Sequence, residues 1–310
     1  MAALPTSPET PTVYVIAEQA CGPDLRRVLE SGIAALGAGP CDVADLPVGP
    51  APGDADRARV LEFLLDSYNA RGAFVDGPAE QFFDARLDAY DMMDEACTVL
   101  GEVGVIVRRP GSLRAAAPRL AAAARAAERV LRADTPEVLV FGSGPDARAL
   151  AAALGTGACA VSPAKITLAG NNAAGLALAR RNLAGILPDG RLEIRHIEGP
   201  AENDRLLALL PPGSGVVRAV DGKDSPAVGA ASAALYPEGA VIWDMRAPAT
   251  GSPFLASAVR QREIANLTLS DRSAYREERH VAVLDAIFGE EAGDAARQSL
   301  RDAIREVHAR

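Results

Sequence analysis

Three short segments of the sequence carry residues that could take part in chemistry. The first is a turn of small residues that consists of Gly142, Ser143, Gly144, Pro145, Asp146 and Ala147. It fits the pattern Gly-x-Gly-x-x-Ala, in which the first glycine permits a tight turn, the second lets backbone approach a diphosphate, and the third small residue lets a helix pack closely on a strand. An apolar strand pattern precedes the turn and a helical pattern follows it, at residues 138–141 and 146–154. This context predicts a dinucleotide site in which the start of a helix offers amides to phosphate.

Two further readings of the turn stay open. The turn could hold another nucleotide-type ligand, such as an adenosyl compound, or it could be a tight strand–helix connection that binds nothing. Asp146 bears on this choice, because a carboxylate at the mouth of a phosphate site repels phosphate. The alternative role for Asp146 is to cap the helix.

The residues that would complete a cofactor site follow two later strands. Asn171 and Asn172 come after the strand predicted at residues 165–169, where an acid would hold a ribose and an arginine would hold a 2′-phosphate. Asparagine can bond to either ribose form, so the sequence leaves the choice between NAD and NADP open. Ala219 and Val220 end the strand predicted at residues 215–220 and belong to the same candidate site.

The second and third segments contribute carboxylates. Asp76 and Glu80 follow a strand predicted at residues 72–75, and either could act as a general base or bind an amine-bearing substrate. Asp244 ends the apolar strand at residues 240–244, and the carboxyl ends of strands face the ligand crevice in open α/β sheets. The alternatives are solvated loop carboxylates for the first two and a structural role for Asp244.

The elements that must position these residues alternate along the chain. Strands are predicted at residues 13–17, 41–46, 72–75 and 103–108, with helices at residues 24–36, 58–70 and 87–101. A long helix is predicted at residues 115–133, followed by strands at residues 138–141, 165–169, 192–196, 215–220 and 240–244, with helices between them. This alternation predicts an α/β fold with mostly parallel sheets. We expect a substrate domain at residues 1–114 and 271–310, a Rossmann-type dinucleotide-binding domain at residues 115–270, and a cleft between them.

Composition narrows the class of protein. Hydrophobic residues make up 49% of the 310 residues, aromatics only 4%, and the net charge is −9. A net-acidic chain lacks the basic footprint of a nucleic-acid binder, so we expect a small-molecule substrate and no nucleic acid. No apolar stretch is long enough to cross a bilayer, and the first residues show no basic region followed by an apolar run. The four cysteines form no metal-type spacing with the three histidines. We therefore expect a cytoplasmic protein with no metal site; the oligomeric state stays open, a homodimer included.

The motifs together resemble the shikimate/quinate dehydrogenase family. The nucleotide loop of the family, Gly-Ala-Gly-Gly-Ala-x-Arg-Ala, is similar to Gly-Ser-Gly-Pro-Asp-Ala-Arg-Ala at residues 142–149. The family's Gly-Phe-Asn-Val-Thr-x-Pro-Phe-Lys is similar to residues 72–80, and its segment ending in Gly-Ala-Val-Asn is similar to residues 91–104. Ser-Pro-Phe-Leu at residues 252–255 resembles the family's Thr-Pro-Leu-Leu. The resemblance covers most of residues 70–290.

The resemblance implies a fold and a cofactor, NADP or NAD, but not the family's reaction. Where the family has a catalytic lysine this chain has Glu80, and Asp76 takes the place of a threonine. The substrate-binding asparagine and tyrosine correspond to Gly104 and Ala247, and the family's Asn-Thr-Asp corresponds to residues 117–119, Ala-Pro-Arg. Because a glutamate in place of a lysine would repel an anionic acid, we expect an NAD(P)-dependent oxidoreductase whose small hydroxy or keto substrate is not shikimate. The alternative is a non-catalytic nucleotide-binding or sensor protein on the same fold.

Overall fold

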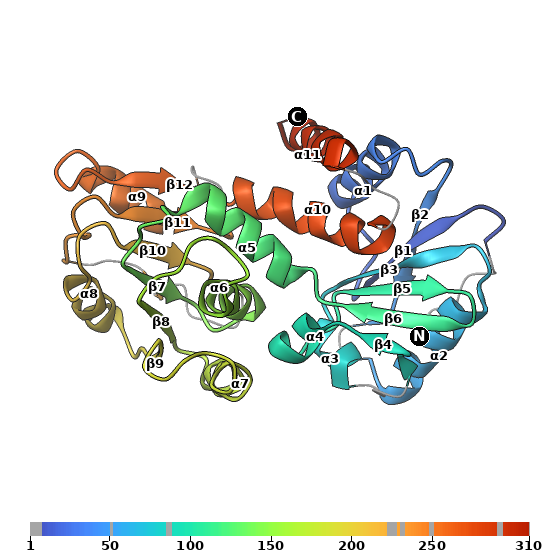
Figure 1. Ribbon diagram of the computed structural model, residues 1–310, viewed down its shortest axis with the longest axis horizontal. Helices are drawn as coiled ribbons and strands as arrows, with labels where there is room; N and C mark the ends of the chain where they lie inside the picture. Colours follow the sequence, from blue (N-terminus) through green and yellow to red (C-terminus); the bar gives the residue numbers. More distant parts are fainter. Residues whose placement is uncertain are drawn as a thin grey trace. The chain divides into compact units, whose positions relative to one another are not determined.

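The chain folds into two compact units. The computed structural model describes residues 8–49, 52–84, 89–221, 228–229, 233–247, 251–289 and 294–309. The first unit comprises Met1–Arg119 and Arg279–Arg310, and the second comprises Leu120–Glu278 (Figure 1). The C-terminal segment therefore returns to the unit that the N-terminal residues begin. It does so through helix α10, Ser273–Phe288, which contains the boundary between the units.

The first unit is built on a six-stranded sheet with the order β2-β1-β3-β5-β6-β4. Among these strands only β5 runs opposite to the rest, because β1 pairs in parallel with β2 and β3, β4 pairs in parallel with β6, and β5 is antiparallel to both of its neighbours. The strands are β1 Thr12–Ala17, β2 Asp42–Pro47, β3 Ala70–Asp76, β4 Met92–Met93, β5 Val105–Arg109 and β6 Ser112–Ala116. The carboxyl ends of β1, β2 and β3 consequently meet at one edge.

Helices cover both faces of this sheet. Val13 and Val15 of β1 belong to a core cluster with side chains from α1, α10 and α11, whereas Tyr14 makes an edge-to-face contact with Phe63 of α2 at 5.3 Å between ring centroids. Alternate side chains of a strand point to opposite faces, so the two groups of helices lie on opposite sides. The helices of this unit are α1 Pro23–Ala35, α2 Asp54–Asp66, α3 Ala79–Asp84, α4 Glu95–Leu100 and α11 Asp294–Ala309.

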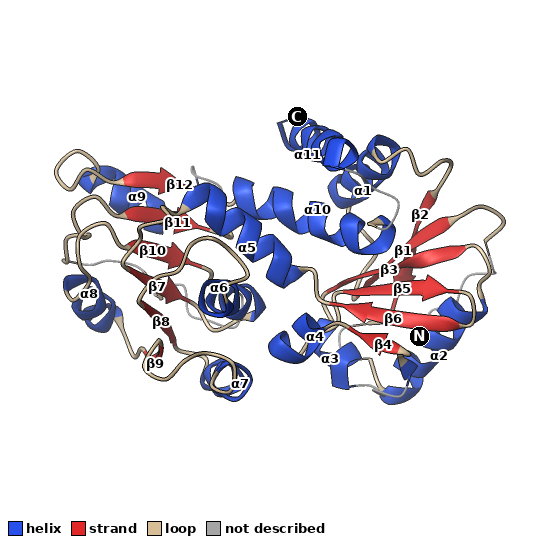
Figure 2. Cartoon of the chain, viewed as in Figure 1, coloured by secondary structure: helices blue, strands red, loops and turns tan. Residues whose placement is uncertain are grey.

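The second unit contains a parallel six-stranded sheet with the order β12-β11-β10-β7-β8-β9 (Figure 2). The chain runs outward from β7 through β8 to β9, then returns to the middle and runs outward the other way from β10. The order of the strands therefore reverses between β7 and β10, which is where open α/β sheets bind ligands beyond the carboxyl ends of their strands. The strands are β7 Glu137–Phe141, β8 Lys165–Gly170, β9 Leu192–His196, β10 Gly215–Arg218, β11 Val241–Asp244 and β12 Thr268–Ser270.

Connecting helices bury the apolar strands of the second unit. Leu139 and Phe141 of β7 pack in one core cluster with Leu207 of α8 and with Phe254 and Leu255 of α9. Helix α6 packs on β7 and β8, and α7 packs on β9. The helices are α5 Arg119–Val130, α6 Pro145–Thr156, α7 Ala173–Leu183, α8 Pro200–Ala208 and α9 Pro253–Gln261.

The predicted α/β class with mostly parallel sheets is confirmed, but several element predictions were wrong. The helix predicted at residues 58–70 ends at Asp66, because β3 begins at Ala70. The long helix predicted from residue 115 begins only at Arg119, because residues 112–116 form β6, which pairs with β5 across the turn at Pro110 and Gly111. The helix predicted at residues 87–101 is α4 alone, which begins after its N-cap Asp94. Strand β4 precedes it, and residues 85–88 lie outside the described residues. Strand β12 was not predicted at all.

Across the described residues, no helix has both the length and the apolar character that crossing a membrane requires.

Candidate functional site

The glycine turn lies between β7 and α6, at the reversal point of the second sheet. Gly142 has a φ of 131°, a region that side-chain-bearing residues rarely adopt, and its N–H donates to Ala169 O at 2.8 Å. A Cβ at this position would stand 2.6 Å from Ala219 O, so only glycine fits between β7 and the end of β10. Gly144 is the N-cap of α6 and supplies no side-chain oxygen to the first turn. The start of α6 thus keeps the arrangement that binds anions through backbone amides.

Substituting Gly142 by alanine is expected to cost about 2 kcal/mol of unfolding free energy, because the new methyl group meets backbone in an unfavourable φ region. Gly157 provides a matched control at the other end of α6: its φ is 78°, and nothing lies within 4 Å of an added Cβ. Gly157→Ala should therefore cost about 1 kcal/mol, from backbone strain alone. Urea unfolding midpoints measure both, and equal losses would contradict the close approach at Gly142.

The first turn of α7 covers Ser143, and one of the two asparagines caps that helix. Ser143 is fully buried, and a Cβ on Gly175 would stand 2.7 Å from its Oγ. Asn172 is the N-cap of α7, and its Oδ1 accepts a hydrogen bond from Gly175 N at 3.3 Å. Asn171 immediately follows β8 and is half-buried. Of the two predicted cofactor-binding asparagines, Asn172 therefore caps a helix, whereas Asn171 lies directly after the end of β8.

Asp146 does not cap α6. Its Oδ1 accepts a hydrogen bond from the Tyr275 hydroxyl at 2.7 Å, and its Oδ2 pairs with Arg246 Nη1 at 2.6 Å. Only 4% of the Asp146 side chain is exposed. Both oxygens are thus engaged by α10 and by the segment after β11, and the arginine balances the charge that would oppose phosphate. Pro145 occupies the first position of α6, where a missing N–H costs no hydrogen bond.

Asp221 stands over the turn, and sequence analysis did not select it. A Cβ on Gly144 would come within 2.7 Å of Asp221 Cγ, so the carboxylate faces the second glycine at close range. Asp221 follows β10 directly after Ala219 and Val220, which are both buried. Its place directly after β10 could have identified it. In a sheet whose strand order reverses between β7 and β10, the residues after β10 face the turn after β7. The carboxylate therefore lies beside the start of α6.

Asp244 is fully buried and its hydrogen bonds are structural. Its Oδ1 accepts the backbone N–H groups of Arg246 at 3.0 Å and Ala247 at 2.9 Å. Its Oδ2 accepts the hydroxyl of Ser252 at 2.6 Å and lies 3.4 Å from Arg218 Nη1. Because Ser252 is also the N-cap of α9, the carboxylate ties the end of β11 to the start of that helix.

In the first unit, Asp76 ends β3 and has an arginine partner. Arg279 Nη2 donates to Asp76 Oδ1 at 2.9 Å, and the same guanidinium lies 5.6 Å from the centroid of the Phe74 ring. The Asp76 side chain is 38% exposed. The pair is therefore partly accessible to solvent, and the arginine balances the charge of Asp76 at the carboxyl edge of the sheet.

Other ionisable groups gather at the same edge. Asp45 of β2 pairs with Arg26 Nη2 at 2.8 Å and accepts Cys21 N–H at 2.9 Å. Burial raises the pKa of the Cys21 thiol, and the nearby charges of Asp45 and Asp76 raise it further. Glu80 lies in α3, four residues after Asp76, and is half-buried. The edge thus combines a protonated thiol, two arginine-paired aspartates and a glutamate, a set suited to hydrogen bonding and proton transfer.

The two units together form an α/β fold with a glycine turn at the reversal point of a parallel sheet, and comparison with solved structures specifies that fold. A shikimate 5-dehydrogenase from Listeria monocytogenes, solved with shikimate and NAD, is 16% identical over 99% of both chains with a TM-score of 0.72. The shikimate dehydrogenase of Mycobacterium tuberculosis is 17% identical over 94% of this chain and 99% of that one, with a TM-score of 0.65. The 5-ketofructose reductase of Gluconobacter sp. strain CHM43 is 17% identical over 94% of this chain and 97% of that one, with a TM-score of 0.65. No family model matches the chain, and no curated protein sequence does.

The protein therefore has a shikimate dehydrogenase-like fold, as the motif resemblance implied. At 14–17% identity the likeness establishes the fold alone. The positions matched to the family's substrate-binding asparagine and tyrosine carry no hydrogen-bonding side chain here, since they are Gly104 and Ala247. Lys223, one of only two lysines in the sequence, lies outside the described residues.

Proposed function

We propose that the protein is an NAD(P)-dependent oxidoreductase that passes hydride between nicotinamide and a small hydroxy or keto compound. The observation that carries the proposal is the glycine turn at the reversal point of a parallel sheet, with Gly142 at positive φ and an uncapped helix start at Gly144. Backbone amides at such a helix start bind diphosphate without a cationic side chain. The fold is also that of shikimate dehydrogenases that are solved with NADP or NAD.

The cofactor proposed for this site is NAD in preference to NADP. The residue after β8 is Asn171, and no lysine or arginine follows in the sequence until Arg180. A neutral strand end can bond to ribose hydroxyls but offers no charge to a 2′-phosphate. Asp221 adds negative charge near the diphosphate, which penalises the more highly charged cofactor more strongly.

The substrate proposed is neutral or amine-bearing rather than a carboxylic acid. Where the resembling family has a lysine this chain has Glu80, so the side chain at that position is negative instead of positive. A lysine would attract a substrate carboxylate, whereas a glutamate would repel it. Glu80 is the candidate base, because it stands where the resembling family has its lysine and would accept a proton from a substrate hydroxyl.

A non-catalytic nucleotide-binding role is the second candidate, and one observation favours it. Gly104 and Ala247 replace two substrate-binding side chains of the resembling family, and a polyol needs such hydrogen-bonding groups in order to be oriented. A protein that senses the nucleotide would need only the turn and the fold.

The single tryptophan allows a direct test. Trp243 is fully buried in β11 of the same unit as the turn, so energy transfer to bound NADH should quench its fluorescence saturably. We expect NADH to bind more tightly than NADPH, by about tenfold. Turnover of any hydroxy, keto or amino-alcohol compound, abolished by Glu80→Gln, would support the enzyme. Binding without turnover across a broad panel would favour the sensor, and failure of both cofactors to bind would exclude both candidates.

A further inference from the structure

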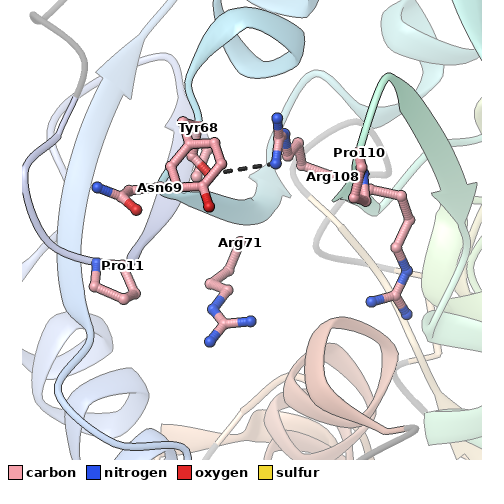
Figure 3. Close-up of a pocket in the computed structure, with 8 residues that line it drawn as sticks. Pro11, Tyr68, Asn69, Arg71, Arg108 and Pro110 are labelled. Carbon is pink, nitrogen blue, oxygen red and sulfur yellow. Dashed lines mark hydrogen bonds between the residues drawn. The ribbon is translucent and has the colours of Figure 1, made fainter.

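A polar cavity lies in the first unit, at the opposite end of the sheet from Asp76. Its volume is about 320 Å³, and it is lined by Pro11, Tyr68, Asn69, Ala70, Arg71, Arg108, Arg109 and Pro110 (Figure 3). Thr12 pairs with Ala70 in register, so the cavity lies at the amino ends of β1 and β3 and beside the end of antiparallel β5. It shares no lining residue with the glycine turn or with the Asp76 edge.

The lining of this cavity has the opposite charge to the chain as a whole. Three of its residues are arginines and none is acidic, in a chain whose net charge is −9. Arg71 is exposed and forms no ion pair with any described carboxylate. Arg108 donates to the Tyr68 carbonyl at 3.2 Å, and its Nε, although buried, has no hydrogen-bond partner among the described residues. Two guanidinium groups at one cavity, those of Arg71 and Arg108, thus form no ion pair with a described carboxylate, which favours an anion within the cavity.

Tyr68 adds an aromatic surface to this charge. Its side chain is 81% exposed, which is unusual for so large a ring, and the Arg108 guanidinium lies 5.8 Å from the ring centroid. In Figure 3 Tyr68, Arg71 and Arg108 appear between Pro11 and Pro110. An exposed ring backed by a cation offers a flat face on which a planar ligand can stack.

The walls of the cavity are held in place by hydrogen bonds. Asn69 Nδ2 donates to the carbonyls of Pro8 at 3.0 Å and Glu9 at 2.8 Å, which fixes the segment before β1. Asp42 is the neighbouring acid, paired in register with Thr12, and its carboxylate accepts a hydrogen bond from the Thr10 hydroxyl. Asp42 itself does not line the cavity.

From these observations we propose that this arginine cavity binds a small phosphate monoester that carries a planar ring. Arg71 and Arg108 would hold the phosphate dianion, and the Tyr68 ring would stack on the planar group. The volume suits a ligand of one ring and one phosphate and is at the lower limit for small-molecule sites. The proposal does not depend on the oxidoreductase activity proposed above.

Phenyl phosphate is a suitable probe, since it has the proposed chemistry and lacks the adenosine that the glycine turn would recognise. Calorimetric titration of the full chain at low ionic strength should give saturable one-to-one binding. Arg71→Gln should weaken it about tenfold, because an exposed guanidinium is lost without disturbing packing. Arg27→Gln is the control: Arg27 is a 53% exposed arginine of α1 in the same unit, and the change in net charge is identical. This variant should leave phenyl phosphate binding within about twofold.

Tyr68→Ala separates the two parts of the proposed recognition. It should weaken phenyl phosphate binding about fivefold while leaving the weaker binding of inorganic phosphate unchanged, because only the ring loses a partner. Absence of saturable binding, or binding that Arg71→Gln and Arg27→Gln reduce equally, would overturn the proposal. The proposal would also be overturned if Arg71→Gln changed the molar mass of the protein in solution and left phenyl phosphate binding unchanged. The face around Arg71 would then be a contact between protein chains.

Discussion

Asp244→Ala is expected to lower the free energy of unfolding by about 3–5 kcal/mol, the largest loss that we expect from any single change at the candidate site. The carboxylate is fully buried and accepts two backbone N–H groups and the Ser252 hydroxyl. Removing it leaves these donors without an acceptor and leaves Arg218, whose side chain is 16% exposed, without its counter-charge. A urea unfolding curve followed by Trp243 fluorescence measures the loss in the unit concerned.

Two comparisons make this result specific. Asp244→Asn keeps an acceptor of similar size and should lose about 1–2 kcal/mol, less than alanine. Asp189→Ala removes an exposed acid from the same unit and should change stability by no more than about 0.5 kcal/mol. If Asp244→Ala unfolds at the wild-type urea concentration but abolishes turnover, the structural account is wrong and the sequence-based prediction of a catalytic Asp244 gains support.

The parts of the fold that local pattern determines were predictable. The strand at residues 138–141 and the turn after it follow from an apolar run, two glycines and a helical pattern that are adjacent in the sequence. Strand β6 was missed because its alanines favour a helix, and only pairing with β5 makes the segment extended. Its burial pattern, with Leu113 and Ala115 inside, depends on a partner strand that composition does not reveal.

The charges of the candidate site were not predictable, because each depends on a residue far away in the sequence. Asp146 was expected to repel phosphate or to cap a helix, and nothing near it indicates that Tyr275 and Arg246 take its two oxygens. Similarly, Asp76 faces Arg279 only because the C-terminal segment returns to the first unit. Sequence spacing identified which acids stand at strand ends, whereas their partners require the tertiary fold.

Asp221 is expected to weaken dinucleotide binding, and removal of its charge should strengthen it. The carboxylate faces Gly144 at the start of α6, where the proposed diphosphate would approach, so two negative groups would lie close together. Two unit charges about 5 Å apart repel by roughly 3 kcal/mol at an effective dielectric constant of 20, and solvent exposure reduces this. We therefore expect Asp221→Asn to tighten NADH binding about tenfold and Asp221→Lys, which reverses the charge, about a hundredfold.

The dependence on ionic strength and the size of the substituted side chain distinguish charge repulsion by Asp221 from steric blocking by it. Asparagine has nearly the volume of aspartate, so a purely steric obstacle would persist in Asp221→Asn and disappear only in Asp221→Ala. Charge repulsion instead predicts that the gain in affinity from Asp221→Asn shrinks as ionic strength rises from about 0.01 to 1 M. Asp189→Asn, with the same change in net charge at an exposed site in the same unit, should leave NADH affinity unaltered. Equal affinities of wild type and Asp221→Asn at low salt would place the diphosphate elsewhere, whereas failure of every variant to bind NADH would remove the proposed cofactor itself.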